Sequence, residues 1–183
     1  MKTTFTGKRI TGVLTILPEQ EYIYEDEIAK EPEENRRLKR LKRIMGYGKR
    51  RRAKETTTVS DMILYGAKKL IQEGKIKKEE IGAVVVVPLS PDYFCPTVSA
   101  IVQGELGLTD DVLCVDIPQA CAGYVVGLMQ SFMLLEHMEG KKVLLCTGET
   151  FCRGNKEKQE PPYYRAPFGG DAAKITIVEN GGE

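Results

Sequence analysis

The sequence contains no tryptophan and a single histidine, His137, among its 183 residues. Its five cysteines form no Cys-x-x-Cys pair, so we expect no zinc site and no closed set of disulfides. This use of cysteine favours a reducing cytoplasm. No apolar run approaches the roughly 18 residues that a membrane-spanning helix needs. We therefore expect a soluble cytoplasmic protein with no membrane span, no metal and no tightly bound cofactor.

An excess of charge of one sign is also missing. The 27 Lys and Arg residues nearly balance the 26 Asp and Glu residues, which leaves a net charge of +1, so bulk charge indicates no polyanionic partner. The hydrophobic fraction of 42% is sufficient for a buried core at this length. We expect one domain over residues 1–183.

Apolar runs of strand length alternate with segments of helical periodicity. Residues 81–88, Ile-Gly-Ala-Val-Val-Val-Val-Pro, predict a strand that is buried on both faces. Further strands are expected at residues 9–17, 112–117, 143–147 and 173–178. Helices are expected at residues 58–74, 97–106 and 122–138, with a weaker one inside 25–43. This alternation predicts an α/β fold, with residues 154–167 as a loop.

Cys121 lies between the strand at residues 112–117 and a helix at 122–138 that is apolar nearly all round, which predicts a buried helix. A thiol at a helix start lies near the positive end of the helix dipole, which favours the thiolate. The small residues Ala120, Ala122 and Gly123 leave space for an incoming thioester. The backbone N–H of Cys121 is a candidate donor to the oxyanion of a tetrahedral intermediate. Cys121 is therefore the candidate nucleophile.

The alternative interpretation is that Cys121 is a small buried residue, since free cysteine is among the most buried residue types. That interpretation is preferred for Cys114 and Cys146, which stand mid-strand among Val and Leu. Cys95 and Cys152 are expected in loops, without a helix start and small neighbours on both sides.

Residues 116–124, Asp-Ile-Pro-Gln-Ala-Cys-Ala-Gly-Tyr, resemble the nucleophile segment of the β-ketoacyl-acyl-carrier-protein synthase III family, a member of the thiolase-like superfamily. Other segments resemble the same family in the same order along the chain: Ile10–Gly12 with Leu17–Pro18, Ile44–Arg52, Ile81–Val86, Ser90–Ser99 and Gly169–Ala173. The resemblance covers essentially the whole chain.

The resemblance implies a thiolase-like fold, in which two βαβαβαββ halves form an α/β/α/β/α layered sandwich, usually in a homodimer. It implies an acyltransferase of fatty acid biosynthesis. The acyl group passes from a coenzyme A or carrier-protein thioester to Cys121 and is condensed with malonyl-acyl carrier protein. The partners implied are acyl carrier protein and acyl-CoA, with coenzyme A or phosphopantetheine thioesters as substrates.

The residues of this chain match only the N-terminal half of the family. The family's histidine and asparagine come from the C-terminal half, and His137 stands about 24 Å along the expected helix from Cys121, too far to act as its base. We therefore expect that condensation needs a complementary C-terminal half. The alternative function is a noncatalytic subunit that binds acyl carrier protein, or a truncated, inactive relative.

The resemblance implies that the loop at Ser90–Ser99 lines the acyl pocket. In the family a Phe often precedes the loop proline and lines the pocket across the dimer interface. The corresponding residue here is Cys95, preceded by Phe94. We take Phe94, Cys95 and Gly123 as candidate pocket residues. The family's synthases also hold the adenine of coenzyme A with a tryptophan, which this chain lacks.

Between Arg36 and Lys54, eleven of nineteen residues are Lys or Arg. Tyr47 is the one aromatic residue there, so base stacking has little support and we expect no nucleic-acid binding. One interpretation is a solvated charged face. The other is docking, because the resemblance places this region beside the pantetheine tunnel, where cations bind phosphate and acidic surfaces. The candidate residues are Arg40, Arg43, Arg50 and Arg51.

Overall fold

The computed structural model describes residues 3–23, 25–26, 35–46, 48–150, 152 and 169–181. Its contacts divide the chain into two compact units. The first unit contains residues 1–16, 58–149 and 173–183, and the second contains residues 17–57 and 150–172. The two units are described in turn.

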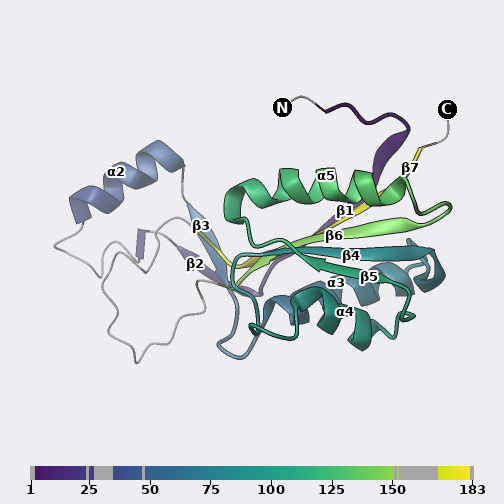
Figure 1. Ribbon diagram of the computed structural model, residues 1–183. Coiled ribbons are helices and arrows are strands. Elements are labelled where there is room, and N and C mark those ends of the chain that lie inside the picture. The colour runs from purple at the N-terminus through teal and green to yellow at the C-terminus, as the bar shows by residue number, and fades with distance from the viewer. Residues whose placement is uncertain are drawn as a thin grey trace. The chain divides into compact units, whose positions relative to one another are not determined.

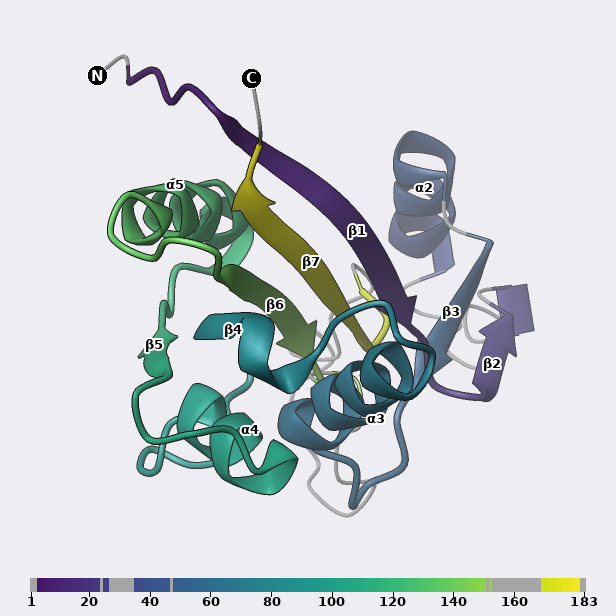
Figure 2. The ribbon, with the colours of Figure 1, turned by 90° about the vertical axis from the view of Figure 1, so that its right-hand side faces the viewer.

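Within the described residues, the first unit is built on a five-stranded mixed sheet (Figures 1 and 2). Its strand order is β1-β7-β6-β4-β5. β1 pairs antiparallel with β7, and β4 pairs parallel with both β5 and β6. The strands are β1 (Lys8–Ile16), β4 (Ile81–Pro88), β5 (Leu113–Asp116), β6 (Lys142–Glu149) and β7 (Ala172–Asn180).

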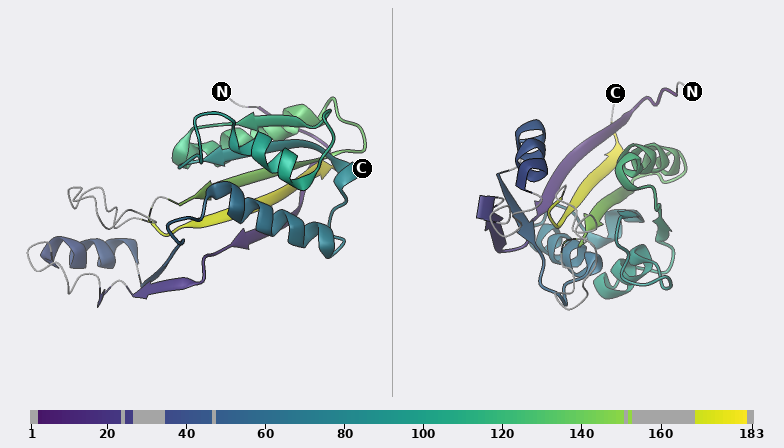
Figure 3. Two further views of the ribbon diagram at one scale, coloured as in Figure 1. Left: turned by 90° about the horizontal axis from the view of Figure 1, so that it is seen from below. Right: turned by 90° about the vertical axis from the view of Figure 1, so that its left-hand side faces the viewer.

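Helices cover both faces of this sheet. α3 (Val59–Gln72) and α4 (Val98–Leu106) lie on one face, and α5 (Gly123–Leu135) lies on the other (Figures 1 and 3). A short 3-10 helix, η1 (Lys78–Glu80), precedes β4. Within the first unit, the main helices and strands follow one another in the order β1, α3, β4, α4, β5, α5, β6 and β7. This is the βαβαβαββ order that the resemblance implies.

The strand β4 explains why the core has two parts. All eight of its residues are buried, as its β-branched run predicts. Successive side chains of a strand point to opposite faces. Val84 and Val86 accordingly join the core beneath α3 and α4, while Val85 and Val87 join the core beneath α5. Both faces of the sheet are therefore packed, which fixes the register of the parallel strands.

The starts of α3 and α4 agree with the sequence to within one residue. Thr58 is the N-cap of α3 and forms a capping box with Asp61, since each side chain accepts from the other residue's backbone N–H. Thr97 is the N-cap of α4, where its side chain accepts from Ala100 N–H. Side-chain capping satisfies the N–H groups that a first helical turn leaves without partners.

α5 differs from the prediction in two ways. It spans Gly123–Leu135 and is shorter at both ends than the predicted helix at 122–138. It is also not buried all round. One face packs on the sheet, whereas Val125 is 70% exposed and Met133 is 48% exposed. The sequence correctly marks both faces as apolar, but a single sheet covers one face only.

The second unit contains two paired antiparallel strands, a long-loop hairpin, that the sequence does not predict. β2 (Gln20–Ile23) pairs antiparallel with β3 (Lys49–Arg52), and α2 (Asn35–Met45) lies between them in the sequence. β3 reads Lys-Arg-Arg-Arg, so it has none of the apolar alternation by which a strand is recognised. Residues 27–34, within the range of the weaker predicted helix, lie outside the described residues, as does the predicted loop at 154–167.

Candidate active site

The parallel strands β4 and β5 end at the same edge of the sheet. β4 ends at Pro88 and is followed by the loop at 89–97, and β5 ends at Asp116 and is followed by the segment at 117–122. Ligands of open α/β sheets bind beyond the carboxyl ends of the strands. The topology therefore brings the loop of Phe94 and Cys95 and the segment of Cys121 to the edge where a ligand is expected.

Cys121 lies in a single 3-10 turn, η2 (Ala120–Ala122), directly before α5. It is exposed, so the interpretation as a buried structural cysteine is wrong. The preceding Ala120 has a φ of 44°, and among the described residues it is the one residue other than glycine with a positive φ. Such a conformation costs about 1–3 kcal/mol and is concentrated at functional sites. The strained turn presents the thiol at the protein surface.

Two glycines set how closely the start of α5 approaches the sheet. A Cβ atom at Gly123 would lie 2.3 Å from Val87 Cγ1, and one at Gly127 would lie 2.7 Å from Leu145 Cδ1. Ser131, one further turn along, is fully buried and donates a hydrogen bond to the Gly127 carbonyl at 2.7 Å. The small residues recur every four positions, so they form one face of the helix. This close packing fixes the position of α5 and of Cys121 before it.

Gly123 was expected to line the acyl pocket. The structure shows it buried and directed at the sheet, which gives it a packing role. Its part in a pocket stays a prediction. Phe94 is fully exposed, at 103%, and the neighbouring Cys95 is exposed beside a cis Cys95–Pro96 bond. Their contact with an acyl chain also stays a prediction.

The remaining cysteines differ from Cys121 in their surroundings. Cys146 is fully buried in β6, and burial raises the pKa of its thiol to about 12. Burial, with a contribution from Asp116, also raises the pKa of the Cys114 thiol. A protonated thiol is a poor nucleophile, which agrees with the interpretation of Cys146 as a buried structural cysteine. Cys114 is only half-buried, so its expected burial is met in part. Cys152 is half-buried, and its Sγ lies 3.3 Å from the Gly169 carbonyl oxygen.

His137 follows the C-terminus of α5 and is exposed. The 13 residues of α5 separate it from Cys121, a length of about 20 Å at 1.5 Å per residue. The expectation that His137 is not the base for Cys121 is confirmed. Among the described residues, no group of three or more His, Cys, Asp or Glu side chains is arranged to hold a metal ion.

Comparison with known proteins gives relatives that match from about half to nearly all of the chain. A protein named putative 3-oxoacyl-acyl-carrier-protein synthase 3, from Campylobacter jejuni, is 33% identical over 180 residues, which are 98% of this chain and 50% of the relative. A β-ketoacyl-acyl-carrier-protein synthase III from Lactobacillus helveticus is 37% identical over 105 residues, which are 57% of this chain and 32% of the relative. No family model matches the sequence.

The structures of known proteins give the same result for the fold. The crystal structure of a 3-oxoacyl-acyl-carrier-protein synthase from Burkholderia xenovorans superimposes with a TM-score of 0.83, at 24% identity, over 98% of this chain and 50% of that chain. The resemblance to the β-ketoacyl-acyl-carrier-protein synthase III family is confirmed. The fold is thiolase-like, and the chain spans about half the length of the relatives that it matches.

The four candidate docking arginines of this chain belong to the second unit and fall into two pairs. Arg40 and Arg43 lie on α2 and are exposed. Arg50 and Arg51 lie in β3, where Arg51 donates to the Glu19 carbonyl at 2.7 Å and pairs with Glu21 at 3.0 Å. Arg51 is therefore held by contacts with β2 and the residue before it, and Arg50 donates to the Gly169 carbonyl at 3.4 Å. Arg40 and Arg43 are exposed to solvent.

The hairpin is held together by charge and stacking rather than by an apolar face. Glu21 also pairs with Lys49 at 2.8 Å, and these contacts lower the pKa of the Glu21 carboxyl, led by its hydrogen bond with Lys49. The guanidinium of Arg52 lies 4.4 Å from the centre of the Tyr22 ring. Cation–π contacts of this kind stabilise a strand that has few apolar side chains.

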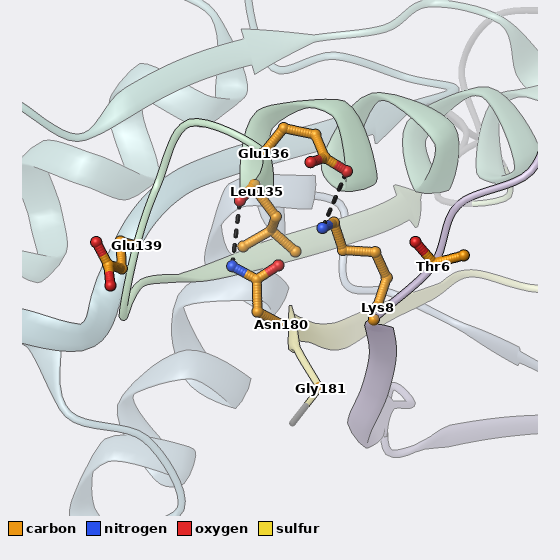
Figure 4. A pocket seen from close by; sticks show the side chains of 8 residues that line it. Thr6, Lys8, Leu135, Glu136, Glu139, Asn180 and Gly181 are labelled. Carbon is orange, nitrogen blue, oxygen red and sulfur yellow. Dashed lines mark hydrogen bonds and ion pairs between the residues drawn. The ribbon is translucent and has the colours of Figure 1, made fainter. Parts of the chain in front are cut away.

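A surface hollow of about 400 Å³ lies at the C-terminal end of α5, whereas Cys121 precedes the N-terminal end. Figure 4 shows the side chains that line the hollow. There Lys8 Nζ pairs with Glu136 at 3.0 Å, and Asn180 Nδ2 donates to the Leu135 carbonyl at 3.1 Å. Asn180 therefore satisfies one of the carbonyl groups that the helix end leaves without a partner. The hollow is lined by no cysteine, and its two contacts join the C-terminal end of α5 to β1 and β7.

No helix within the described residues is long and apolar enough to cross a membrane.

Proposed function

We propose that this chain accepts an acyl group on Cys121 as the nucleophile-bearing half of a β-ketoacyl-acyl-carrier-protein synthase III. The Cys121 thiolate attacks the thioester carbonyl of an acyl-CoA or acyl-carrier-protein donor. The resulting oxyanion collapses, the bond from the carbonyl carbon to the donor sulfur breaks, and the donor leaves as a thiolate that takes up a proton. The product is a new thioester on Cys121.

The observation that carries this proposal is the placement of Cys121. Its thiol is exposed, it follows a residue of positive φ, and it precedes a helix at the carboxyl edge of parallel strands. Directly after such a nucleophile, the N–H groups of the first helical turn have no partner within the helix, and they can donate to a developing oxyanion. The names of the relatives supply the reaction class.

For the full reaction we propose that condensation with malonyl-acyl carrier protein needs a histidine and an asparagine from a complementary half. Two observations support this. The relatives have about twice the length of this chain. The outer face of α5 carries Val125 and Met133, which are exposed here and suited to packing against another polypeptide. We expect a homodimer of the completed enzyme.

For donor binding we propose that Arg40 and Arg43 recognise the acidic surface of acyl carrier protein or the phosphates of coenzyme A. Both side chains are exposed on one helix. Arg is suited to this role because its planar guanidinium donates bidentate hydrogen bonds to phosphate and carboxylate groups. Arg50 and Arg51 are part of β3, where Arg51 pairs with Glu21 of β2.

The test is incubation of the purified chain with a short acyl-CoA and with the matching acyl-pantetheine, followed by peptide mass mapping. We expect an acyl adduct on Cys121 that hydroxylamine releases, and no adduct at that peptide in the Cys121→Ser variant. The exposed Cys95 is the internal control, since it tests bare thiol reactivity. A folded protein with no adduct, or with equal adducts on both cysteines, would favour the noncatalytic carrier-binding function instead.

A further inference from the structure

The carboxylate of Asp116 joins the two loops that carry the proposed site. Asp116 ends β5, five residues before Cys121. Its two oxygens each accept a backbone hydrogen bond at 2.9 Å, one from Val98 N–H and one from Ser99 N–H. Those N–H groups belong to the first turn of α4, immediately after the loop at 89–97.

These hydrogen bonds are of a strong kind. The acceptor is charged, and charge-assisted bonds are roughly twice as strong as bonds between neutral groups. The donors lie at a helix N-terminus, where the macrodipole also favours a negative charge. Thr97, the residue directly before α4, already caps the helix, since its side chain accepts from Ala100 N–H. The hydrogen bonds to Asp116 therefore join the start of α4 to β5, in addition to the cap that Thr97 supplies.

Backbone hydrogen bonds also fix the segment between Asp116 and Cys121. Ile117 N–H donates to the Val86 carbonyl of β4 at 2.8 Å, and Gln119 N–H donates to the Ile117 carbonyl at 2.9 Å. The next residue, Ala120, begins η2, which contains Cys121. The loop at 89–97 leads directly into α4, and Asp116 leads through this fixed segment to Cys121. If the start of α4 moves away from Asp116, the loop therefore moves relative to Cys121.

We propose that Asp116 is a positioning residue, which holds the loop at 89–97 against the Cys121 segment so that a bound thioester meets the thiol. This inference rests on the proposed acyl transfer to Cys121. It assigns to Asp116 a role in the reaction of a large thioester, for which the loop supplies part of the binding surface, and no role in the intrinsic reactivity of the thiol.

The test compares Asp116→Asn with Asp61→Asn in the full chain. Asp61 is the matched control, because its carboxylate also accepts a backbone hydrogen bond at a helix start, from the N–H of the α3 N-cap residue Thr58 at 2.9 Å. Each variant is assayed at Cys121 with acyl-CoA and with iodoacetamide, a small reagent that needs no pocket. Amide hydrogen exchange at Val98 and Ser99 reports whether the tie is lost.

We expect Asp116→Asn to slow acylation of Cys121 by about tenfold or more, since misplacement by about 1 Å costs up to about a hundredfold. Its reaction with iodoacetamide should stay within about twofold of the wild type, and exchange at Val98 and Ser99 should accelerate. Asp61→Asn should leave both reactions unchanged. Acylation unchanged in Asp116→Asn, or both reagents slowed equally, would overturn the inference. A wild-type chain that is not acylated would instead overturn the proposed function and this role with it.

Discussion

Replacement of Gly123 by Ala tests how the start of α5 holds Cys121. The backbone of Gly123, with φ −62° and ψ −32°, suits any residue, so the effect of the change is purely steric. The added Cβ would lie 2.3 Å from Val87 Cγ1, which is about 1 Å shorter than the ~3.5 Å of a favourable carbon contact. Val87 is 5% exposed and packed in the core, so it has little room to move.

Overpacking of this kind costs about 1–3 kcal/mol. The better helix propensity of Ala recovers at most ~1 kcal/mol of this. We therefore expect a net loss of about 1–2 kcal/mol, which corresponds to a Tm lower by about 2–8 °C for a chain of this size. Thermal unfolding followed by circular dichroism measures this shift. Because α5 must move, acylation of Cys121 should also slow.

Gly104 provides the matched control. It lies in α4, and a Cβ there would have no neighbour within 4 Å. Gly104→Ala should raise the free energy of unfolding by about 0.5–1 kcal/mol through helix propensity alone. If Gly123→Ala were as stable as Gly104→Ala, the reasoning that Gly123 is required for close packing on Val87 would be refuted.

Two further predictions concern other groups. Burial raises the pKa of Cys146 to about 12. The folded chain therefore keeps a proton that the unfolded chain loses near pH 9. Between these two pH values the free energy of unfolding should fall by about 1.4 kcal/mol per pH unit. Cys146→Ala should make urea unfolding less sensitive to pH over that range, and an unchanged slope would contradict the assignment. Reversal of charge at Arg40 and Arg43 to Glu should raise the half-saturating concentration of an acyl-carrier-protein donor by about tenfold at low salt. Acyl-pantetheine should be unaffected, and equal effects on the two donors would argue against docking at α2.

Most elements of the first unit could be predicted because burial on both faces leaves a clear signal. The run at 81–88 has the bounds of β4, and Thr58 and Thr97 mark the helix starts. The hairpin of β2 and β3 could not be predicted in the same way. Its stability comes from ion pairs and stacking between residues far apart in the sequence, which no periodicity reveals.

The candidate site was predictable in its nucleophile and less so in its geometry. The small residues around Cys121 mark the segment, but the positive φ of Ala120 depends on the tertiary path of the chain. Gly123 was assigned to a pocket because it is small, whereas its neighbour in space is Val87. The spacing of Gly123, Gly127 and Ser131 was a readable signal of a helix packed closely on a sheet. The tie from Asp116 to α4 joins positions 17 and 18 residues apart and has no local signature.

The most direct test of the central claim is the rate of acylation of Cys121 relative to Cys95 in the same molecules. Both thiols are exposed, so solvent access alone gives them similar rates. If Cys121 is an acyl-accepting nucleophile, peptide mass mapping after exposure to an acyl-CoA will show its adduct forming at least about tenfold faster, in keeping with an activated thiol. Equal rates at the two cysteines, or an adduct on Cys95 alone, would contradict the account.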